Sequence, residues 1–305
     1  MSTSNAQAGS KAYAAFIPEL WSTKIVELLH KSCVMLQCVN RNYEGEIRQK
    51  GDTVHIRSFS AMAITDYDGS IEDAAYETPT PVEQELVIDQ AKMWGLKIDD
   101  VSKAQSDINI LTGYAKEAAY ALETTIDTFL LAKHADVPAG NTIGTDAAPI
   151  ALTKDNIYSQ FVQLASKLKS ANAVGKGKMK PFVIVNPVIE ALLLQAPEFI
   201  HATQSGDTTL REGSIGRIAG LDVLLTTNFV AVSSKYYILA GTNEAITFAE
   251  QLTKTETVKD KSFFGDLVRG LAVYGAKTVQ ANALAKIVTT VASWIGGAIP
   301  LSFYN

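Results

Sequence analysis

The stretch that decides the fold is SDINILTGYAKEAAYALETTIDTFLLAKHADVPAG, residues 106–140. Its apolar residues recur at steps of three and four, the spacing of one helix face. They are Leu111, Ala115, Ala118, Leu122, Ile126, Phe129 and Leu130. Ser106 or Asp107 can cap the start, and Pro138 with Gly140 ends the pattern. We predict a helix over about residues 107–135, roughly 40 Å long, that acts as a structural spine.

Two β-like stretches lie before this helix. GDTVHIRSF (51–59) and ELVIDQAKMWGLKID (85–99) alternate apolar and polar residues, and they predict the two strands of a long hairpin. From Ser58 to Ala91 the chain has no Lys or Arg, but it has Asp66, Asp68, Glu72, Asp73, Glu77, Glu83, Glu85 and Asp89. A tip this long and polar brings little apolar area to bury on its own subunit, so we expect it to contact another molecule.

An α/β unit is predicted after a connection at residues 137–150. A second helix follows Thr153, its expected cap, with inward residues Ile157, Phe161, Leu164 and Leu168. A buried strand at 182–185 then leads into a helix that Asn186 caps and Pro187 begins.

The last third of the chain favours β-structure. GLDVLLTT (220–227) and KYYILAG (235–241) predict strands. Residues 244–279 also alternate, and we expect them to form strands that return to the long helix.

Composition indicates a folded protein without a strongly basic surface. The 305 residues are 47% hydrophobic and 19% charged, which is ordinary for a folded chain. The net charge of -5 argues against tight nonspecific binding of nucleic acid, because such binding needs Lys and Arg to displace counterions.

The two ends of the chain carry no recognised targeting pattern. Residues 1–15 are polar and small, unlike a signal peptide, and predict an arm that precedes a short amphipathic helix within residues 16–36. Residues 287–305 are uncharged, but Gly296, Gly297 and Pro300 interrupt them. We expect packed strands or a subunit contact there and no membrane anchor.

No motif in the sequence points to catalysis, a cofactor or a metal. Gly213, Gly216 and Gly220 precede a strand where a dinucleotide site would need a helix, and GKGKMK (175–180) lacks the spacing of a P-loop. The four histidines have no metal-ligand spacing. Cys33 and Cys38 are expected as reduced thiols in preference to a disulfide or metal pair. The sequence therefore favours a non-enzymatic protein whose role is to interact with other molecules.

A cluster of lysines could complement the acidic hairpin tip. Lys167, Lys169, Lys176, Lys178 and Lys180 form a run with no acid between Asp155 and Glu190. The run is either a solvated loop or a basic patch that meets nucleic acid or an acidic partner, such as the tip of a neighbouring copy. The candidate inter-subunit residues are these five lysines with Asp66, Asp68, Glu72, Asp73 and Glu77.

The order of elements resembles the major capsid (coat) protein of tailed bacteriophages, which has the Hong Kong 97-type fold. The likeness is carried by residues 16–59, KPFVIVNPVIEALLL (180–194), GRIAGLDVLLTTN (216–228) and FFGDLVRGLAVYGAKTVQANALAKI (263–287). The resemblance implies an α+β fold with an N-terminal arm, an extended β-hairpin loop, a spine helix in a peripheral domain and an α/β axial domain. The implied segments are an arm (1–39), an extended loop (40–98), a peripheral domain (99–149), an axial domain (150–244), a return to the peripheral domain (245–290) and a tail (291–305).

The resemblance also implies the function. It predicts a structural protein that self-assembles through hexamers and pentamers into the icosahedral shell of a phage with a double-stranded DNA genome. Implied partners are further copies of the chain, scaffolding, portal and decoration proteins, and packaged DNA in loose contact, with no membrane and no cofactor. The expected location is the virion, after synthesis in the bacterial cytoplasm.

Two other functions remain open at this point. One is the shell of an encapsulin-like nanocompartment, which shares the fold and would hold a cargo enzyme in place of a genome. The other is a cytosolic α/β enzyme or ligand-binding protein that uses the glycine-rich loop at residues 213–220.

Overall fold

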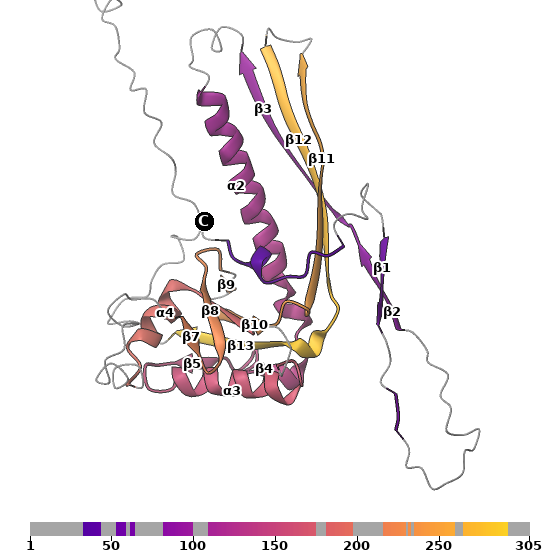
Figure 1. Ribbon diagram of the computed structural model, residues 1–305. Coiled ribbons are helices and arrows are strands. Elements are labelled where there is room, and N and C mark those ends of the chain that lie inside the picture. Colours follow the sequence, from indigo (N-terminus) through magenta and orange to yellow (C-terminus); the bar gives the residue numbers. More distant parts are fainter. Residues whose placement is uncertain are drawn as a thin grey trace, which may run out of the picture.

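A body of mixed helix and sheet carries two long projections (Figure 1). The computed structural model describes residues 33–43, 53–58, 62–64, 82–99, 109–174, 181–197, 216–229, 231–232, 235–259 and 265–291. Residues 1–32 of the predicted arm, the acidic tip at 65–81, the lysines at 175–180 and the tail beyond residue 291 lie outside these residues. No helix in the described part of the chain is long and apolar enough to cross a membrane.

An eight-stranded mixed sheet forms the centre of the body. Its main path runs β4-β13-β10-β6-β8-β7, with β5 paired to β13 and β9 paired to β10. In chain order the strands are β4 (Thr142–Ile143), β5 (Ile150–Leu152), β6 (Phe182–Val185), β7 (Arg217–Ile218), β8 (Leu221–Leu225), β9 (Ala231–Val232), β10 (Lys235–Gly241) and β13 (Leu284–Val291). The sheet is hydrophobic on both faces and separates two cores.

Two helices pack on one face of this sheet. They are α3 (Ile157–Ser170) and α4 (Pro187–Leu194). The predicted inward residues Ile157, Phe161, Leu164 and Leu168 are all fully buried, which confirms the helical periodicity. The predicted strand at 182–185 is also confirmed, and Asn186 Oδ1 accepts a hydrogen bond of 2.8 Å from Ile189 N at the start of α4.

The expected cap of α3 is wrong. Asn156, not Thr153, is the residue before the helix. The Asn156 side chain is turned back toward the preceding segment, where its Oδ1 accepts from Thr153 N and its Nδ2 donates to Ala151 O, each at 2.9 Å. The first turn is held instead by Thr153 O, which accepts from the backbone N–H groups of Asn156 and Ile157.

The long helix and a three-stranded sheet form one projection, which rises from the body in Figure 1. The helix is α2 (Asn109–Leu131), continued by the 3-10 turn η5 (Ala132–Asp136), as the apolar stripe predicted. The sheet has the order β11 (Ile246–Lys259), β12 (Gly265–Thr278) and β3 (Gln90–Asp99). Ile126 and Leu130 of α2 belong to one buried cluster with Phe248 of β11 and Tyr274 of β12.

The second projection is a hairpin of β1 (Thr53–Ser58) and β2 (Val82–Val87), paired antiparallel as predicted. The expected single strand over 85–99 is wrong, because β2 ends at Val87 and β3 pairs with β12 in the other sheet. Ile88, at the break, is fully buried in a cluster with Leu86, Val54 and Val273. The chain divides there because its apolar residues face two different partners.

The C-terminal strand also departs from expectation. β11 and β12 return to the long helix as predicted, but the chain then turns through η7 (Ala281–Ala283) and enters the eight-stranded sheet. There β13 lies between β10 and the short strands β4 and β5. Its residues Ala285 and Ile287 fill the core beneath α3. Burial of both faces of the strand favours this central position.

The glycine-rich stretch near residue 216 enters a strand, as expected. β7 and β8 pair antiparallel, and Ala219 and Gly220 between them have φ values of 50° and 92°. Positive φ at both central residues is the geometry of a tight hairpin turn. Since a strand follows, the helix N-terminus needed to bind a dinucleotide phosphate does not form at this position.

Candidate assembly surfaces

The hairpin of β1 and β2 has one buried and one exposed face. Val54, Ile56 and Leu86 point inward and pack with Ala249 and Val273 of the three-stranded sheet. Val87 and its neighbours at alternate positions point outward, because successive side chains of a strand lie on opposite faces. The inward apolar side chains therefore attach one face of the hairpin to the body, and the outward face stays exposed to solvent in the isolated chain.

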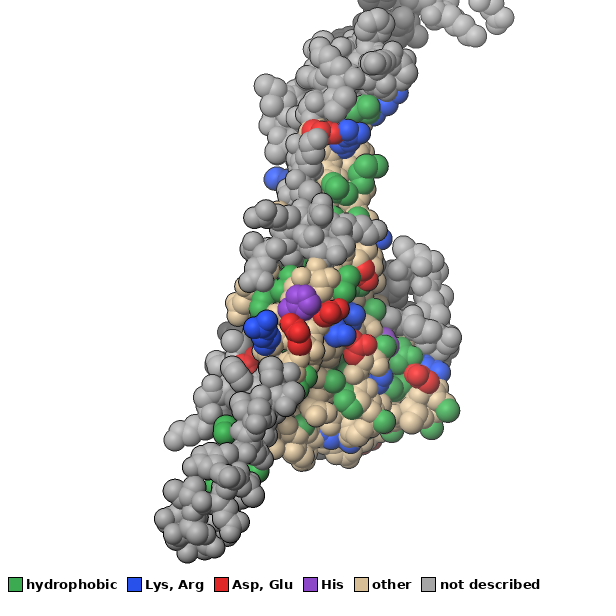
Figure 2. Space-filling view, turned by 90° about the vertical axis from the view of Figure 1, so that its right-hand side faces the viewer, with side chains coloured by type: hydrophobic (Ala, Val, Ile, Leu, Met, Phe, Trp, Pro, Cys, Tyr) green, Lys and Arg blue, Asp and Glu red, His purple; other side chains and the backbone are tan. Residues whose placement is uncertain are grey.

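Charged groups gather on the outward face. His55 Nδ1 lies 3.2 Å from Glu83 Oε1, and Arg57 Nε lies 3.8 Å from the same oxygen. All three side chains are about half exposed or more, so these contacts contribute little to stability. Figure 2, which views the molecule from the side that carries this hairpin, shows acidic, basic and His side chains close together there.

Large apolar side chains are also exposed along the projections. Met62 and Ile64, just beyond β1, are 72% and 97% exposed, and Met93 of β3 is 73% exposed. Val82 and Val87 at the two ends of β2 are about half exposed. Large apolar side chains that stay exposed on projecting elements are typical of surfaces that another molecule covers.

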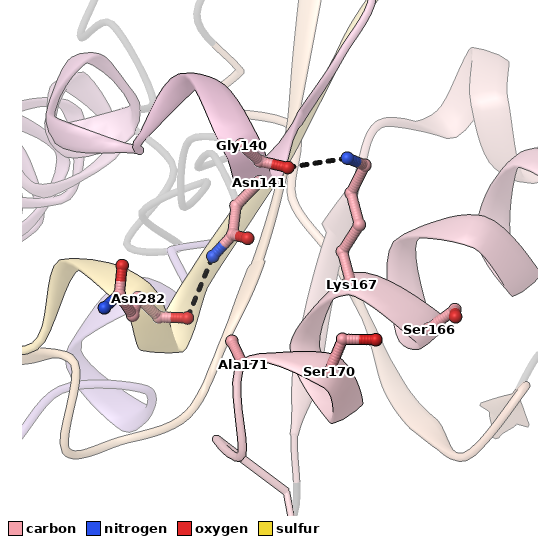
Figure 3. Close-up of a pocket in the computed structure, with 7 residues that line it drawn as sticks. All are labelled: Gly140, Asn141, Ser166, Lys167, Ser170, Ala171 and Asn282. Carbon is pink, nitrogen blue, oxygen red and sulfur yellow. Dashed lines mark hydrogen bonds between the residues drawn. The ribbon is translucent and has the colours of Figure 1, made fainter.

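Lys167, one of the two described lysines of the run, lines a shallow groove of about 470 Å³ (Figure 3). Lys167 reaches across it from α3 and donates a 2.6 Å hydrogen bond to Gly140 O. Asn141 Nδ2 donates to Asn282 O and Leu284 O on the other side, each at 2.9 Å. Lys169, in the last turn of α3, is exposed. The lysines near the helix C-terminus are well placed to interact with its dipole.

The remaining candidate residues lie outside the described residues. These are Lys176, Lys178 and Lys180 of the lysine run, and Asp66, Asp68, Glu72, Asp73 and Glu77 of the hairpin tip. The described residues include no acidic member of this set, so the predicted contact lies outside them.

Metal-binding side chains are not clustered in the described residues. No three His, Cys, Asp or Glu residues among them lie close enough to hold a metal ion. Neither cysteine forms a disulfide, and Cys38 is buried while Cys33 is half-buried. His134 stacks on Tyr237 with ring centroids 4.1 Å apart. Burial, with a smaller effect of the Lys286 ammonium, lowers the pKa of His134.

One buried charged residue escaped the sequence reasoning. Asp127 of α2 is fully buried, and its Oδ1 accepts hydrogen bonds from Val34 N at 3.0 Å and Met35 N at 2.9 Å. Its Oδ2 accepts from Asn228 Nδ2 at 2.9 Å. Burial raises the pKa of Asp127, against the lowering effect of these hydrogen bonds. The signal in the sequence was an acid beside the apolar stripe, between Ile126 and Phe129.

Both the sequence and the fold are similar to those of known phage proteins. Residues 86–297 match a protein family described as phage capsid protein. No curated protein matches the sequence. Among solved structures, one from Mycobacterium phage Che8 is 25% identical, with a TM-score of 0.72, and the match covers 89% of this chain and 97% of that one.

Other phage structures share the fold at lower identity. The capsid structure of cyanophage P-SCSP1u is 15% identical, with a TM-score of 0.72 and coverage of 92% of this chain and 94% of that one. The capsid of Ralstonia phage GP4 is 11% identical, with a TM-score of 0.69 and coverage of 97% and 100%. Since the family match spans more than half of the sequence, this chain belongs to the phage capsid protein family and is a structural major capsid protein.

Proposed function

We propose that the chain self-assembles, through pentamers and hexamers, into an icosahedral shell that encloses a double-stranded DNA genome. The observation that carries the proposal is the pair of projections, whose apolar residues Met62, Ile64 and Met93 stay exposed in the isolated chain. A shell gains its stability from many modest contacts repeated by symmetry, and projecting elements add contact area that a compact face cannot supply.

We further propose that the elements take the roles of the Hong Kong 97-type fold. The spine helix is α2, which with β3, β11 and β12 makes the peripheral domain. The eight-stranded sheet with α3 and α4 makes the axial domain, and β13 belongs to it. Residues 1–39 are the arm and residues 40–98 the extended loop, whose last strand, β3, is shared with the peripheral sheet.

The proposed partners follow from this role. The chain contacts further copies of itself and, during building of the particle, scaffolding, portal and decoration proteins. Its net charge of -5 suits loose contact with packaged DNA, because a strongly basic wall would retain phosphates. The protein is made in the host cytoplasm, resides in the virion and has a structural and not a catalytic role.

We also propose a charge contact between neighbouring copies. The acidic residues Asp66, Asp68, Glu72, Asp73 and Glu77 of one hairpin tip would meet the lysine run at 167–180 of the next copy. Opposite charges on separate subunits favour encounter and fix the register of the contact. The exposed position of Lys169, at the end of α3, supports the basic half of this proposal.

Negative-stain electron microscopy of the purified chain, paired with size-exclusion chromatography, tests the main proposal. Closed shells or pentamer and hexamer rings are the expected products across a series of salt and protein concentrations. A monomer or dimer that stays unassembled, also with the scaffolding protein of its own phage added, would contradict it.

A charge swap tests the contact between copies. We expect D66K/D68K/E72K to block assembly without changing the circular dichroism spectrum. The control D155K/E244K changes charge in the same direction at exposed acids of the body and should assemble. Adding K169E/K176E/K178E to the first variant should restore assembly. Normal shells from the first variant alone would disprove the contact.

A further inference from the structure

A short segment of the chain, residues 33–43, crosses from α2 to the three-stranded sheet (Figure 1). We name it the strap. Its residues Val34, Met35, Cys38 and Val39 are buried in the cluster between the two elements. At its far end Asn40 N donates to Ile246 O at 2.9 Å, and Phe248 N donates to Asn40 O at 2.8 Å. In the sequence, residues 1–32 directly precede the strap.

One carboxylate holds the near end of the strap. Oδ1 of Asp127 accepts both the Val34 and the Met35 N–H, and these are the donors at the start of the 3-10 turn η2 (Met35–Gln37). Oδ2 accepts from Asn228, whose own backbone N donates to Thr226 Oγ1 at 3.1 Å. The side chain thus joins three segments that are about 100 residues apart in sequence: the strap, α2 and the turn after β8.

Stability alone does not account for a charge at this position. Apolar residues of the strap are already buried against Ile126 and Leu130 of α2. A buried charge must give up its hydration, and apolar groups of similar volume often serve stability equally well. The raised pKa of Asp127 leads to the same conclusion, because it means that the folded chain disfavours the charged carboxylate more than the unfolded chain does. What two directed hydrogen bonds supply, and apolar contact does not, is one fixed register of the strap on the helix.

We propose that Asp127 is a positioning residue of assembly, which locks the strap in one register on α2 and so fixes the position of Cys33, the residue to which residues 1–32 are joined in the chain. The proposal rests on the assembly function proposed above for its consequence, although the lock itself is a property of the isolated chain. The proposal distinguishes Asp127 from the residues that build the core, because loss of Asp127 should free the strap and leave the eight-stranded sheet intact.

The variant D127N tests the lock with almost no change in volume. If the amide oxygen faces the strap, the new NH2 group faces Asn228 Nδ2, and donor meets donor. If the oxygen faces Asn228, the NH2 group faces the N–H groups of Val34 and Met35. Asn228 Nδ2 also donates to Thr124 O and Thr128 Oγ1, and these bonds hold its amide in place. With Asn228 so held, neither orientation satisfies all three partners, and neither carries the charge that strengthens the bonds.

Hydrogen exchange of the unassembled subunit is the direct measurement. In D127N the Val34 and Met35 amides should exchange at least tenfold faster than in the native chain, and trypsin should cleave faster after Lys31 and Arg41. Amides of β6 and β10 should keep their native rates. The control D136N removes an exposed acid from η5, and N228A leaves both bonds from the strap to Oδ1 in place, so strap amides should stay protected in both.

The assembly readout completes the test. D127N should give open or irregular products under conditions in which the native chain and D136N close into shells. Native exchange rates at Val34 and Met35 in D127N would overturn the proposal, as would equal loss of protection in β6 and β10, failure of D127N to fold, or normal shells from D127N. Unprotected Val34 and Met35 amides in the native chain would overturn it without any variant. Absence of shells from the native chain would count against the proposed assembly function. The hydrogen-exchange rates of Val34 and Met35 would still test whether Asp127 holds the strap.

Discussion

Replacement of Gly275 by alanine should loosen the projecting hairpin from the body. Gly275 lies in β12, where β2 crosses it closely. A Cβ added there would lie far inside 3.0 Å of the Val87 carbonyl oxygen and 3.1 Å from Ile88 Cα, whereas ordinary contact begins at 3.4 Å. The obstacle is backbone and not the end of a flexible side chain, so β2 itself must move.

The expected loss of unfolding free energy in G275A follows from the buried residues in and next to β2. Leu86 and Ile88 are fully buried in the cluster that attaches the hairpin, and displacement of the strand disturbs both. Forcing extra volume into a packed core costs typically about 1–3 kcal/mol. Because backbone must shift here, we expect the upper part of that range, about 2–3 kcal/mol of unfolding free energy. A loss of 2 kcal/mol lowers the ratio of folded to unfolded chains about 30-fold.

Guanidinium chloride unfolding of the unassembled subunit measures this loss. The matched control is Gly95→Ala in the adjacent strand β3, where nothing lies within 4 Å of an added Cβ. That variant should be as stable as the native chain, or more stable by up to about 1 kcal/mol, because alanine restricts the unfolded state. If G275A and G95A unfold at the same midpoint with the same slope, the close crossing of β2 over β12 is refuted.

Three further predictions concern single side chains. Asn186→Ala removes the bond to Ile189 N at the start of α4 and should lower the unfolding free energy by about 1 kcal/mol, measured in the same assay; an unchanged midpoint would disprove the cap. The pKa of His134 is lowered from 6.5, so the unfolded chain binds a proton more readily than the folded chain, and stability should fall as the pH drops through 6.5 and below. H134F keeps the stack on Tyr237 and cannot titrate, so equal pH profiles for it and the native chain would contradict this assignment. Burial, with a smaller effect of Asp127, raises the pKa of Cys38 to about 12, so a maleimide at pH 8 should leave folded C33S unlabelled until denaturant is added, and rapid labelling would show that Cys38 is accessible.

Elements with strong local signals could be predicted from the sequence. The stripe from Leu122 to Leu130 indicated α2, and the spacing of Ile157, Phe161 and Leu164 indicated α3, because a helix forms its hydrogen bonds between near neighbours. Asn186 before Pro187 marked the start of α4 for the same reason. In these helices the interactions that determine the structure are made between residues close together in the sequence.

The candidate site was less accessible to such reasoning. Composition and the spacing of lysines and acids indicated a protein of interactions, but they could not show that Lys167 reaches Gly140 across a groove. They also missed Asp127, whose role depends on Val34, Met35 and Asn228. No local pattern marks a carboxylate whose partners come from two segments that each lie about 100 residues away in the sequence.

The sequence by itself determined the α+β class, the long helix, the α/β unit and the strands β1, β6 and β10, since hydrophobic periodicity and capping residues act over a few positions. Only the tertiary structure decided how strands pair. It separated β3 from β2 at Ile88 and placed β13 beside β10 and away from β12. The physical reason is that strand pairing joins residues distant in the chain, and the partner is chosen by which faces can be buried together.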